Sequence, residues 1–134
     1  MSTIHVRVLT PEGVYKELDT PILNIDTIDG ARGILPNHMP LVTSVTIGRM
    51  STEENGKREE YAVSGGLLYF RDNNAEILTD AIESKEEIDV DRAERAKKRA
   101  EERLAQVHKE ELDFKRAELA LKRALNRLAV KNGQ

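Results

Sequence analysis

Glycine and proline are distributed very unevenly along the 134 residues of this chain. All four prolines and seven of the eight glycines lie within the first 66 residues, and the next glycine is Gly133. Both residues favour turns and weaken helix interiors, so this division predicts a turn-rich β part followed by a helical part. The pattern changes after Ala81, and we expect two domains, at residues 1–83 and 84–134.

Short apolar runs separated by turn residues fill the first part. The first run places Ile4, Val6 and Val8 on one face and ends at Pro11 and Gly13. Alternation with a period of two is typical of a half-buried strand. Several such runs with no helical pattern between them predict an antiparallel β-sandwich rather than a parallel sheet with crossover helices.

Later features of the first part predict how its strands are arranged. A second strand is expected to place Ile22, Ile25 and Ile28 together, as the first strand does with its own apolar residues. Three residue pairs are expected to form turns between strands: Asn55-Gly56, Gly65-Gly66 and Asn73-Asn74.

Helix-forming residues dominate the second part. Asp89 is a good N-cap for a helix that begins at Val90, and the pattern breaks near His108 to Glu111. A short connection between two helices predicts an antiparallel hairpin. The expected fold class is therefore α+β, mainly β, with a sandwich followed by a two-helix hairpin.

The first helix divides into faces when it is drawn at about 100° per residue. Its apolar face is made of Ala93, Ala96, Ala100, Leu104 and Val107, and its arginine stripe of Arg92, Arg95, Arg99 and Arg103. Like charges four residues apart cost a few tenths of a kcal/mol in an isolated helix. The three alanines bury little apolar surface, and this burial stabilises the packing by roughly 2.4 kcal/mol in total, at about 0.8 kcal/mol per CH₂ group. A ligand at 100 times its dissociation constant stabilises the conformation that binds it by a similar amount, ~2.7 kcal/mol.

The second helix repeats this arrangement. Its expected apolar stripe is Phe114, Ala117, Leu121, Ala124, Leu125 and Leu128, flanked by Arg116, Arg123 and Arg127. If the helices pack side by side, the two basic lines converge on one anion. In the alternative, each arginine covers the apolar seam and pairs with an acid of the body, the β part of the chain.

The net charge of -3 hides an asymmetry. Residues Leu112 to Lys131 contain six bases and two acids and carry +4, so the rest of the chain carries -7. A basic tail on an acidic body predicts an electrostatic partner for the tail, either another surface or the body itself.

Several kinds of chemistry are not expected. The chain has no cysteine, which excludes disulfides and thiolate metal sites, and His5, His38 and His108 lack metal-ligand spacing. There is no Walker A motif, no apolar run of about 18 residues and no signal-peptide pattern, so we expect a cytosolic protein that hydrolyses no nucleotide. Aromatic content is 4% and no aromatic interleaves the arginines, which disfavours nucleic-acid binding.

The whole chain resembles the epsilon subunit of bacterial rotary ATP synthases. The segments that carry the resemblance are "IHVRVLTPEG", "DGARGILPNHMPLV", "YAVSGGLLYF", "IDVDRAERA" and "DFKRAELALKRALNRL". The resemblance implies a non-catalytic subunit of the central stalk that couples proton-driven rotation of the c-ring to ATP synthesis. The implied partners are the gamma subunit, the c-ring and the α/β catalytic head, at the cytoplasmic face of the cell membrane. The resemblance also implies that the C-terminal helices inhibit ATP hydrolysis.

The resemblance also implies site residues. In bacillus-like members an I/L-D-x-x-R-A motif helps bind ATP as a regulatory ligand that favours the folded-down hairpin. Here the motif is Ile88, Asp89, Arg92 and Ala93, with Arg99, Arg123, Arg127 and Glu83 as further contacts. The implied inhibitory contacts with the β subunit are Lys115, Arg116, Lys122 and Arg123, and the loop expected to touch the c-ring contains Asp29, Arg32 and His38. No metal or redox cofactor is expected.

Three functions remain open at this point. The first is the coupling subunit with an ATP-responsive inhibitory hairpin. The second is an arginine-rich hairpin that binds nucleic acid, and the third is a purely structural coupling piece with a permanently docked hairpin. Asp89 likewise has two readings, an ATP contact and a plain helix cap.

Overall fold

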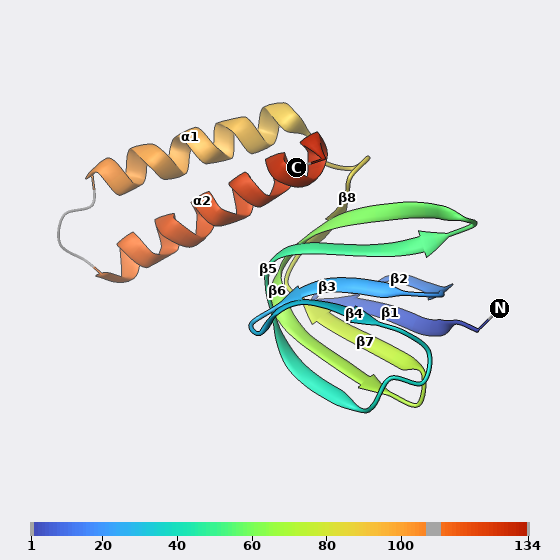
Figure 1. The fold of residues 1–134 in the computed structure, drawn as a ribbon. Helices are drawn as coiled ribbons and strands as arrows, with labels where there is room; N and C mark the ends of the chain where they lie inside the picture. Colours follow the sequence, from blue (N-terminus) through green and yellow to red (C-terminus); the bar gives the residue numbers. More distant parts are fainter. Residues whose placement is uncertain (1, 107–110, 134) are drawn as a thin grey trace. The chain divides into compact units, whose positions relative to one another are not determined.

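The computed structural model describes residues 2–106 and 111–133. The chain divides into two compact units, Met1–Lys85 and Glu86–Gln134, which correspond to the β part and the helical part in Figure 1. Ser84 and Lys85 thus belong to the first unit.

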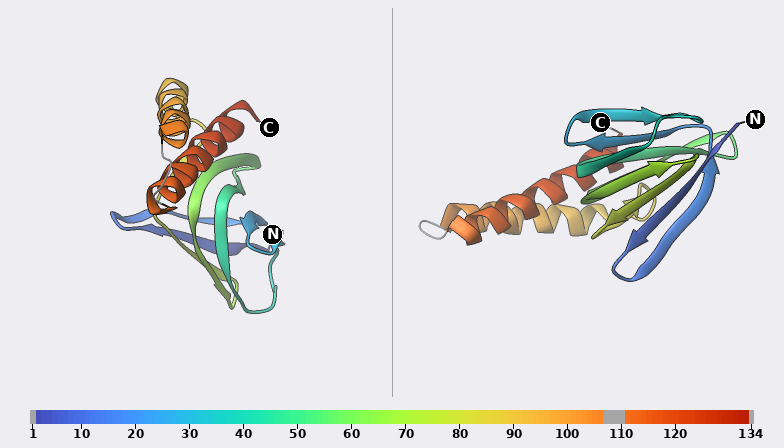
Figure 2. Two further views of the ribbon diagram at one scale, coloured as in Figure 1. Left: turned by 90° about the vertical axis from the view of Figure 1, so that its left-hand side faces the viewer. Right: turned by 90° about the horizontal axis from the view of Figure 1, so that it is seen from below.

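Eight strands make up the first unit. They are β1 (Ile4–Thr10), β2 (Gly13–Thr20), β3 (Leu23–Thr27), β4 (Gly30–Ile34), β5 (Leu41–Glu54), β6 (Lys57–Arg71), β7 (Asn74–Thr79) and β8 (Ile82–Ser84). Their order is β2-β1-β7-β6-β5-β3-β4, and β8 pairs with β6. The sheet curves over on itself, which confirms the predicted sandwich (Figure 2). One pair departs from the antiparallel pattern, because β1 and β7 run parallel.

The core of this unit follows the expected alternation in β1, where Ile4, Val6 and Val8 are fully buried. The prediction for the next apolar run is wrong. In β3 the buried residues are Leu23, Ile25 and Thr27, whereas Ile28 lies after the strand and is 69% exposed. Alternate residues of a strand share a face, so a spacing of three could not keep these isoleucines together.

The turns agree with the sequence in one case and differ by one residue in another. Asn55 and Gly56 connect β5 to β6 with φ of 55° and 76°, as predicted for a tight hairpin. The turn between β6 and β7 is formed by Asp72 and Asn73, with φ of 49° and 62°, whereas Asn74 already pairs with Arg71. The prediction of Asn73-Asn74 is corrected accordingly, because aspartate also tolerates positive φ.

The glycine pair Gly65-Gly66 is not a turn between strands, so that prediction is wrong. Both residues lie inside β6, with φ of 88° and 138°, where the strand leaves β8 and begins to pair with β7. A Cβ atom at residue 66 would overlap the carbonyl oxygen of Leu78 in β7. The pair therefore bends one continuous strand and lets the neighbouring backbone approach.

A polar network lies at the far end of the β5-β6 hairpin. The Lys16 ammonium lies 2.7 Å from the Glu54 carboxylate and donates to the Tyr61 hydroxyl at 2.9 Å, and this hydroxyl donates to Glu54 at 2.7 Å. Burial alone would raise the pKa of Glu54, but hydrogen bonds from Lys16, Tyr61 and Thr52 outweigh it and hold the pKa below its ordinary value. The network therefore gives each of these polar groups a hydrogen-bond or ion-pair partner next to buried side chains.

The second unit is a pair of antiparallel helices, α1 (Val90–Gln106) and α2 (Glu111–Asn132), as predicted (Figure 1). In α1 the alanine face is confirmed, because Ala93 and Ala100 are 1% and 2% exposed and Ala96 and Leu104 are partly buried. Val107 and His108 lie outside the described residues. Glu111, which was expected within the break between the helices, already belongs to α2.

The buried face of α2 differs in part from the predicted stripe. Ala117, Ala124 and Leu128 are buried as expected, but Phe114 and Leu125 are 41% and 44% exposed. Leu125 follows Ala124 by one residue, about 100° around the helix, so the two side chains cannot share the centre of one face. The buried face of α2 thus combines the small residues Ala117 and Ala124 with Leu128 and Val130 near the end of the helix.

Candidate functional site

The four residues of the expected ATP motif lie at the start of α1, with Ile88 and Asp89 before the helix and Arg92 and Ala93 in its first turn. The Arg92 N–H donates to the Asp89 carboxylate at 3.1 Å, and the Ala93 N–H donates to the Asp89 carbonyl at 3.0 Å. Asp89 is therefore the N-cap of α1, as predicted. Ile88 and Ala93 are 3% and 1% exposed, so two buried residues flank the two exposed polar residues Asp89 and Arg92.

The arginine stripe of α1 is exposed along its whole length. Arg92, Arg95, Arg99 and Arg103 are all exposed, and none lies within 4.0 Å of a carboxylate in the described part of the hairpin. The alternative, in which these arginines pair with acids of the body, stays open. Four neighbouring guanidinium groups without counter-ions favour an anion at this face.

The basic residues of α2 fall into two groups by exposure. Lys115, Arg116 and Lys122 are exposed, whereas Arg123 and Arg127 are partly buried. Arg123 and Arg127 lie four residues apart and so share one side of the helix. The convergence of this side with the α1 arginine stripe on one anion stays a prediction.

Glu83 differs from the other expected ATP contacts in its location. It lies in β8 opposite Ala62 of β6, within the first unit. The other seven residues belong to the second unit. The role of Glu83 as an ATP contact stays a prediction.

The stretch from Asp29 to His38 is not a single loop as expected, because residues 30–34 form β4, and its contact with the c-ring stays a prediction. Asp29 lies in the turn before this strand, where its N–H donates to the Thr27 hydroxyl at 3.2 Å. Arg32 lies inside the strand, 4.0 Å from the Asp29 carboxylate. His38 follows the other end of β4, where its ring packs edge-on against Phe70 at 5.7 Å. Five residues of strand, roughly 13 Å, separate the two ends.

An exposed apolar band on the outer face of β5, β6 and β7 was not expected from the sequence. It consists of Val42, Leu67, Tyr69 and Leu78, which are 40% to 61% exposed. Val42 pairs with Tyr69, and Leu67 pairs with Leu78, so the four side chains occupy neighbouring positions. A pocket of about 320 Å³ adjoins the band beside Gly66 and Leu9. Leu67 and Tyr69 alternate with the buried Leu68 and Phe70, and this all-apolar run was the available signal.

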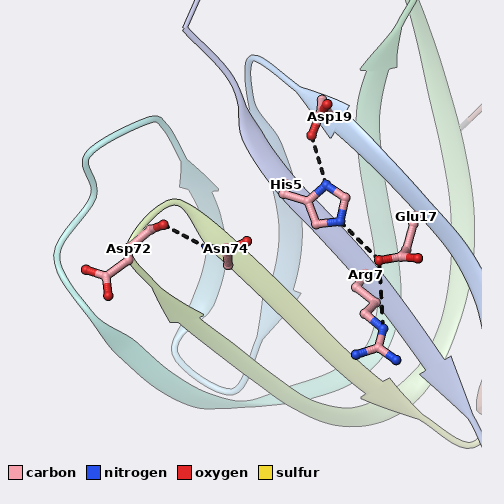
Figure 3. Close-up of polar contacts among 6 residues, drawn as sticks. All are labelled: His5, Arg7, Glu17, Asp19, Asp72 and Asn74. Atoms are coloured by element: carbon pink, nitrogen blue, oxygen red, sulfur yellow. Dashed lines mark hydrogen bonds and ion pairs between the residues drawn. The ribbon is translucent and has the colours of Figure 1, made fainter.

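Charged side chains continue this outer face onto β1 and β2 (Figure 3). The His5 ring lies 2.9 Å from the Asp19 carboxylate and 3.1 Å from that of Glu17, and Arg7 lies 3.9 Å from Glu17. The hydrogen bond to Asp19, and then that to Glu17, raise the pKa of His5 above its ordinary value. The described residues contain no group of three or more side chains suited to a metal ion.

Comparison with known proteins covers both units. The family model "ATP synthase, Delta/Epsilon chain, beta-sandwich domain" matches residues 3–85, and "ATP synthase, Delta/Epsilon chain, long alpha-helix domain" matches residues 86–132. Proteins described as "ATP synthase epsilon chain" are similar in sequence. That of Alkalihalophilus pseudofirmus is 48% identical over 104 residues, 78% of each chain, and that of Shouchella clausii 43% identical over 108 residues, 81% of each chain.

A solved structure has the same fold. It is a chain in the mitochondrial ATP synthase OSCP/F1/c-ring structure from Euglena gracilis, with a TM-score of 0.82 and 23% identity, covering 96% of this chain and 81% of that one. No helix among the described residues is long and apolar enough to cross a membrane. On the strength of both family models and these relatives, the chain belongs to the epsilon-chain family of ATP synthases, which are non-catalytic subunits of the central stalk of the rotary enzyme.

Proposed function

We propose that the chain couples rotation of the c-ring to the catalytic head and that its helices inhibit ATP hydrolysis in an ATP-dependent manner. The observation that carries the proposal is the exposed arginine stripe of α1, which has no counter-ion in the described hairpin and borders a seam of small residues. A polyanion on this stripe would relieve the repulsion between like charges four residues apart. ATP is then a conformational ligand and not a substrate.

The magnitudes support such a switch. Ala93 and Ala100 bury little surface in the seam of α1, on the order of 1 kcal/mol each. ATP at 100 times its dissociation constant would contribute ~2.7 kcal/mol to whichever conformation binds it. The ligand term is therefore as large as the packing that it would reinforce, and bound ATP would favour the folded-down hairpin.

The exposed apolar band of Val42, Leu67, Tyr69 and Leu78 supports a protein partner for the sandwich, and we assign it to the gamma subunit. Asp29, in the turn before β4, and Arg32, inside β4, are proposed as a contact with the c-ring, and His38, beyond the other end of β4, as a separate contact. Lys115, Arg116, Lys122 and Arg123 would meet acidic residues of the β subunit in the catalytic head. This assembly places the chain at the cytoplasmic face of a bacterial membrane.

Calorimetric titration of the full chain with ATP tests the ligand. Arg92→Gln is expected to weaken binding about tenfold, the equivalent of one charge-assisted hydrogen bond. Arg103→Gln, on the same stripe but three turns away, is the matched control and is expected to change affinity less than twofold. Equal effects of the two variants would show a non-specific charge effect and refute a site at the first turn.

Asp89 needs a different pair of variants because it also caps α1. Asparagine is as good an N-cap as aspartate, so Asp89→Asn keeps the helix and removes the charge. If Asp89 contacts ATP or its bound cation, this variant alters ATP affinity while ellipticity at 222 nm stays unchanged. An unchanged affinity would leave Asp89 with the capping role alone.

Inhibition is tested by adding the full chain to an ATP-hydrolysing catalytic head. We expect turnover to fall with the wild type and to recover with Arg123→Gln, whereas Lys98→Gln, an exposed change on α1, keeps the inhibition. Inhibition that is absent at every concentration would favour the structural coupling piece. Steeply salt-dependent binding of the chain to DNA would instead favour the nucleic-acid alternative.

A further inference from the structure

The imidazole ring of His5 is the centre of a charged cluster on the outer face of β1, β2 and β7 (Figure 3). Its Nδ1 atom lies 2.9 Å from the Asp19 carboxylate, and its Nε2 atom lies 3.1 Å from the Glu17 carboxylate. Both carboxylates come from β2, which lies at one end of the strand order. The ring therefore connects this edge strand to β1 at two points.

The backbone register explains why these side chains meet. In the antiparallel β1–β2 ladder, His5 lies opposite Asp19 and Arg7 lies opposite Glu17. The His5 N–H donates to the Asn73 carbonyl at 2.8 Å and not to β2. Positions of an antiparallel ladder without backbone hydrogen bonds bring the opposite side chains closest together. Glu17, two residues from Asp19 on the same face, then reaches the other side of the ring.

The number of protons on the ring decides whether both contacts are favourable. An ionised carboxylate only accepts hydrogen bonds. The imidazolium form of His5 carries an N–H on each nitrogen and can donate to both carboxylates. A neutral imidazole carries one N–H, so its other nitrogen would turn a lone pair toward a carboxylate oxygen. Both contacts are therefore hydrogen bonds only while His5 is protonated.

The charges around the ring also favour its protonated form. Arg7 lies 3.9 Å from the Glu17 carboxylate and opposite Glu76 in the parallel β1–β7 ladder, and the Arg71 guanidinium lies 3.4 Å from Asp72. Among the described residues, the cluster holds three bases, His5, Arg7 and Arg71, and four acids, Glu17, Asp19, Asp72 and Glu76. The excess of acids opposes loss of the His5 proton, and the pKa of His5 is raised, first by the hydrogen bond to Asp19 and then by that to Glu17.

We propose that His5 is a proton-controlled clasp for the edge strand: its imidazolium holds β2 to β1 through Asp19 and Glu17, and its deprotonation loosens this end of β2. Lys16, in the middle of β2, keeps its ion pair with Glu54 in both states, so the strand opens locally and does not leave the sheet. The His5, Glu17 and Asp19 side chains are 43%, 50% and 66% exposed. The effect is therefore that of a surface ion pair, roughly two- to fivefold in the opening equilibrium.

The clasp acts near neutral pH. Because the folded state favours the protonated ring, the stabilisation is fully present below the ordinary pKa of 6.5 and is lost as the pH rises through the higher folded pKa of His5. The inference concerns the sandwich alone and does not rest on the coupling and inhibition proposed above. It is tested without any other subunit.

Hydrogen exchange of backbone amides in the ¹⁵N-labelled full chain tests the clasp. Protection of the Leu18 and Thr20 amides, whose residues pair with Val6 and Ile4 of β1, is measured at about pH 6 and pH 8 and corrected for the intrinsic pH dependence of exchange. We expect protection to be roughly two- to fivefold lower at pH 8 in the wild type. His5→Arg keeps a positive charge and should give the higher protection at both pH values. His5→Gln has no titrating group and should give the lower protection at both.

Carboxylate variants identify the partners of the ring. The ring ¹⁵N signals of His5, identified by their absence in His5→Gln, report its pKa during a pH titration. Asp19→Asn should lower the pKa of His5 most and Glu17→Gln less, because their hydrogen bonds raise it in that order. Glu12→Gln, which removes an acid from the exposed turn of the same hairpin, is the matched control and should leave the pKa of His5 and the protection of β2 unchanged.

Three results would overturn the proposal. Equal protection of Leu18 and Thr20 at both pH values in the wild type would show that no proton controls this end of β2. A pH response that persists in His5→Arg would assign the response to another group. An effect of Glu12→Gln as large as that of Glu17→Gln would show a general charge effect in place of a contact with the ring.

Discussion

The sharpest prediction concerns the hydroxyl of Tyr61. Tyr61→Phe removes one hydroxyl, which accepts a hydrogen bond from Lys16 at 2.9 Å and donates one to Glu54 at 2.7 Å. Tyr61 is only 1% exposed. Hydrogen bonds to charged groups contribute about 1.5–3 kcal/mol each. The Lys16 and Glu54 side chains keep each other at 2.7 Å and are 36% and 18% exposed, which reduces the loss. We expect a cost of about 2 kcal/mol, or roughly 10 °C in the unfolding midpoint of a unit of this size.

Tyrosine fluorescence during urea unfolding of the full chain measures this cost. All three tyrosines, Tyr15, Tyr61 and Tyr69, lie in the first unit, so the signal follows the sandwich and not the helices. Tyr69→Phe is the matched control, because Tyr69 is 54% exposed and its hydroxyl makes no hydrogen bond among the described residues. The control should cost less than about 0.5 kcal/mol. If the two variants lose the same stability, the network does not hold the end of the hairpin.

Further predictions concern the pH response, a close backbone contact and a helix cap. The folded-state pKa of Glu54 is lowered, so the stability that its carboxylate contributes is fully present above its unfolded pKa of about 4.5 and is lost as the pH falls through the folded value. When the free energy of unfolding in urea is measured at a series of pH values, Glu54→Gln should therefore reduce its fall at acid pH. Gly66→Ala should cost at least ~3 kcal/mol, whereas Gly13→Ala, at φ of 119° but in open space, should cost only about 1–2 kcal/mol; equal losses in thermal unfolding would contradict the overlap with Leu78. Asp89→Ala should destabilise the hairpin by about 1 kcal/mol and Asp89→Asn by a few tenths, measured by ellipticity at 222 nm.

Local sequence patterns were sufficient wherever neighbouring residues determine the structure. The alternation in β1 and the Asn55-Gly56 turn depend on periodicity and on backbone preferences within a few residues. The same holds for Asp89, whose carboxylate reaches an N–H three residues on. These features were predicted correctly because no distant contact competes with them.

Features that depend on distant partners were missed. A glycine pair suits a turn and a bend equally well, and only the carbonyl of Leu78 in the neighbouring strand makes Gly66 a bend. The stretch from Asp29 to His38 contains two glycines and a proline and so resembled a loop, but pairing with β3 makes its first half a strand. On α2, Phe114 is apolar and well spaced, yet the buried face is centred on Ala117 and Ala124.

The candidate site shows the same division. Spacing alone placed the arginines of α1 on one exposed face, and the structure agrees. The charged cluster around His5 combines β1 with two carboxylates of β2, and no pattern within one strand indicates it.

The parallel pairing of β1 with β7 has a consequence for how the chain is made. Thr10 ends β1 and Thr79 ends β7, so the ribosome adds 69 further residues before the second neighbour of β1 exists. At 5–20 residues per second this takes roughly 3–14 s. During that time β1 pairs only with β2, and its other edge, with Ile4, Val6 and Val8 beside it, is open to other nascent chains. Slower synthesis of residues 11–79 would lengthen the time for which this edge can pair with another chain.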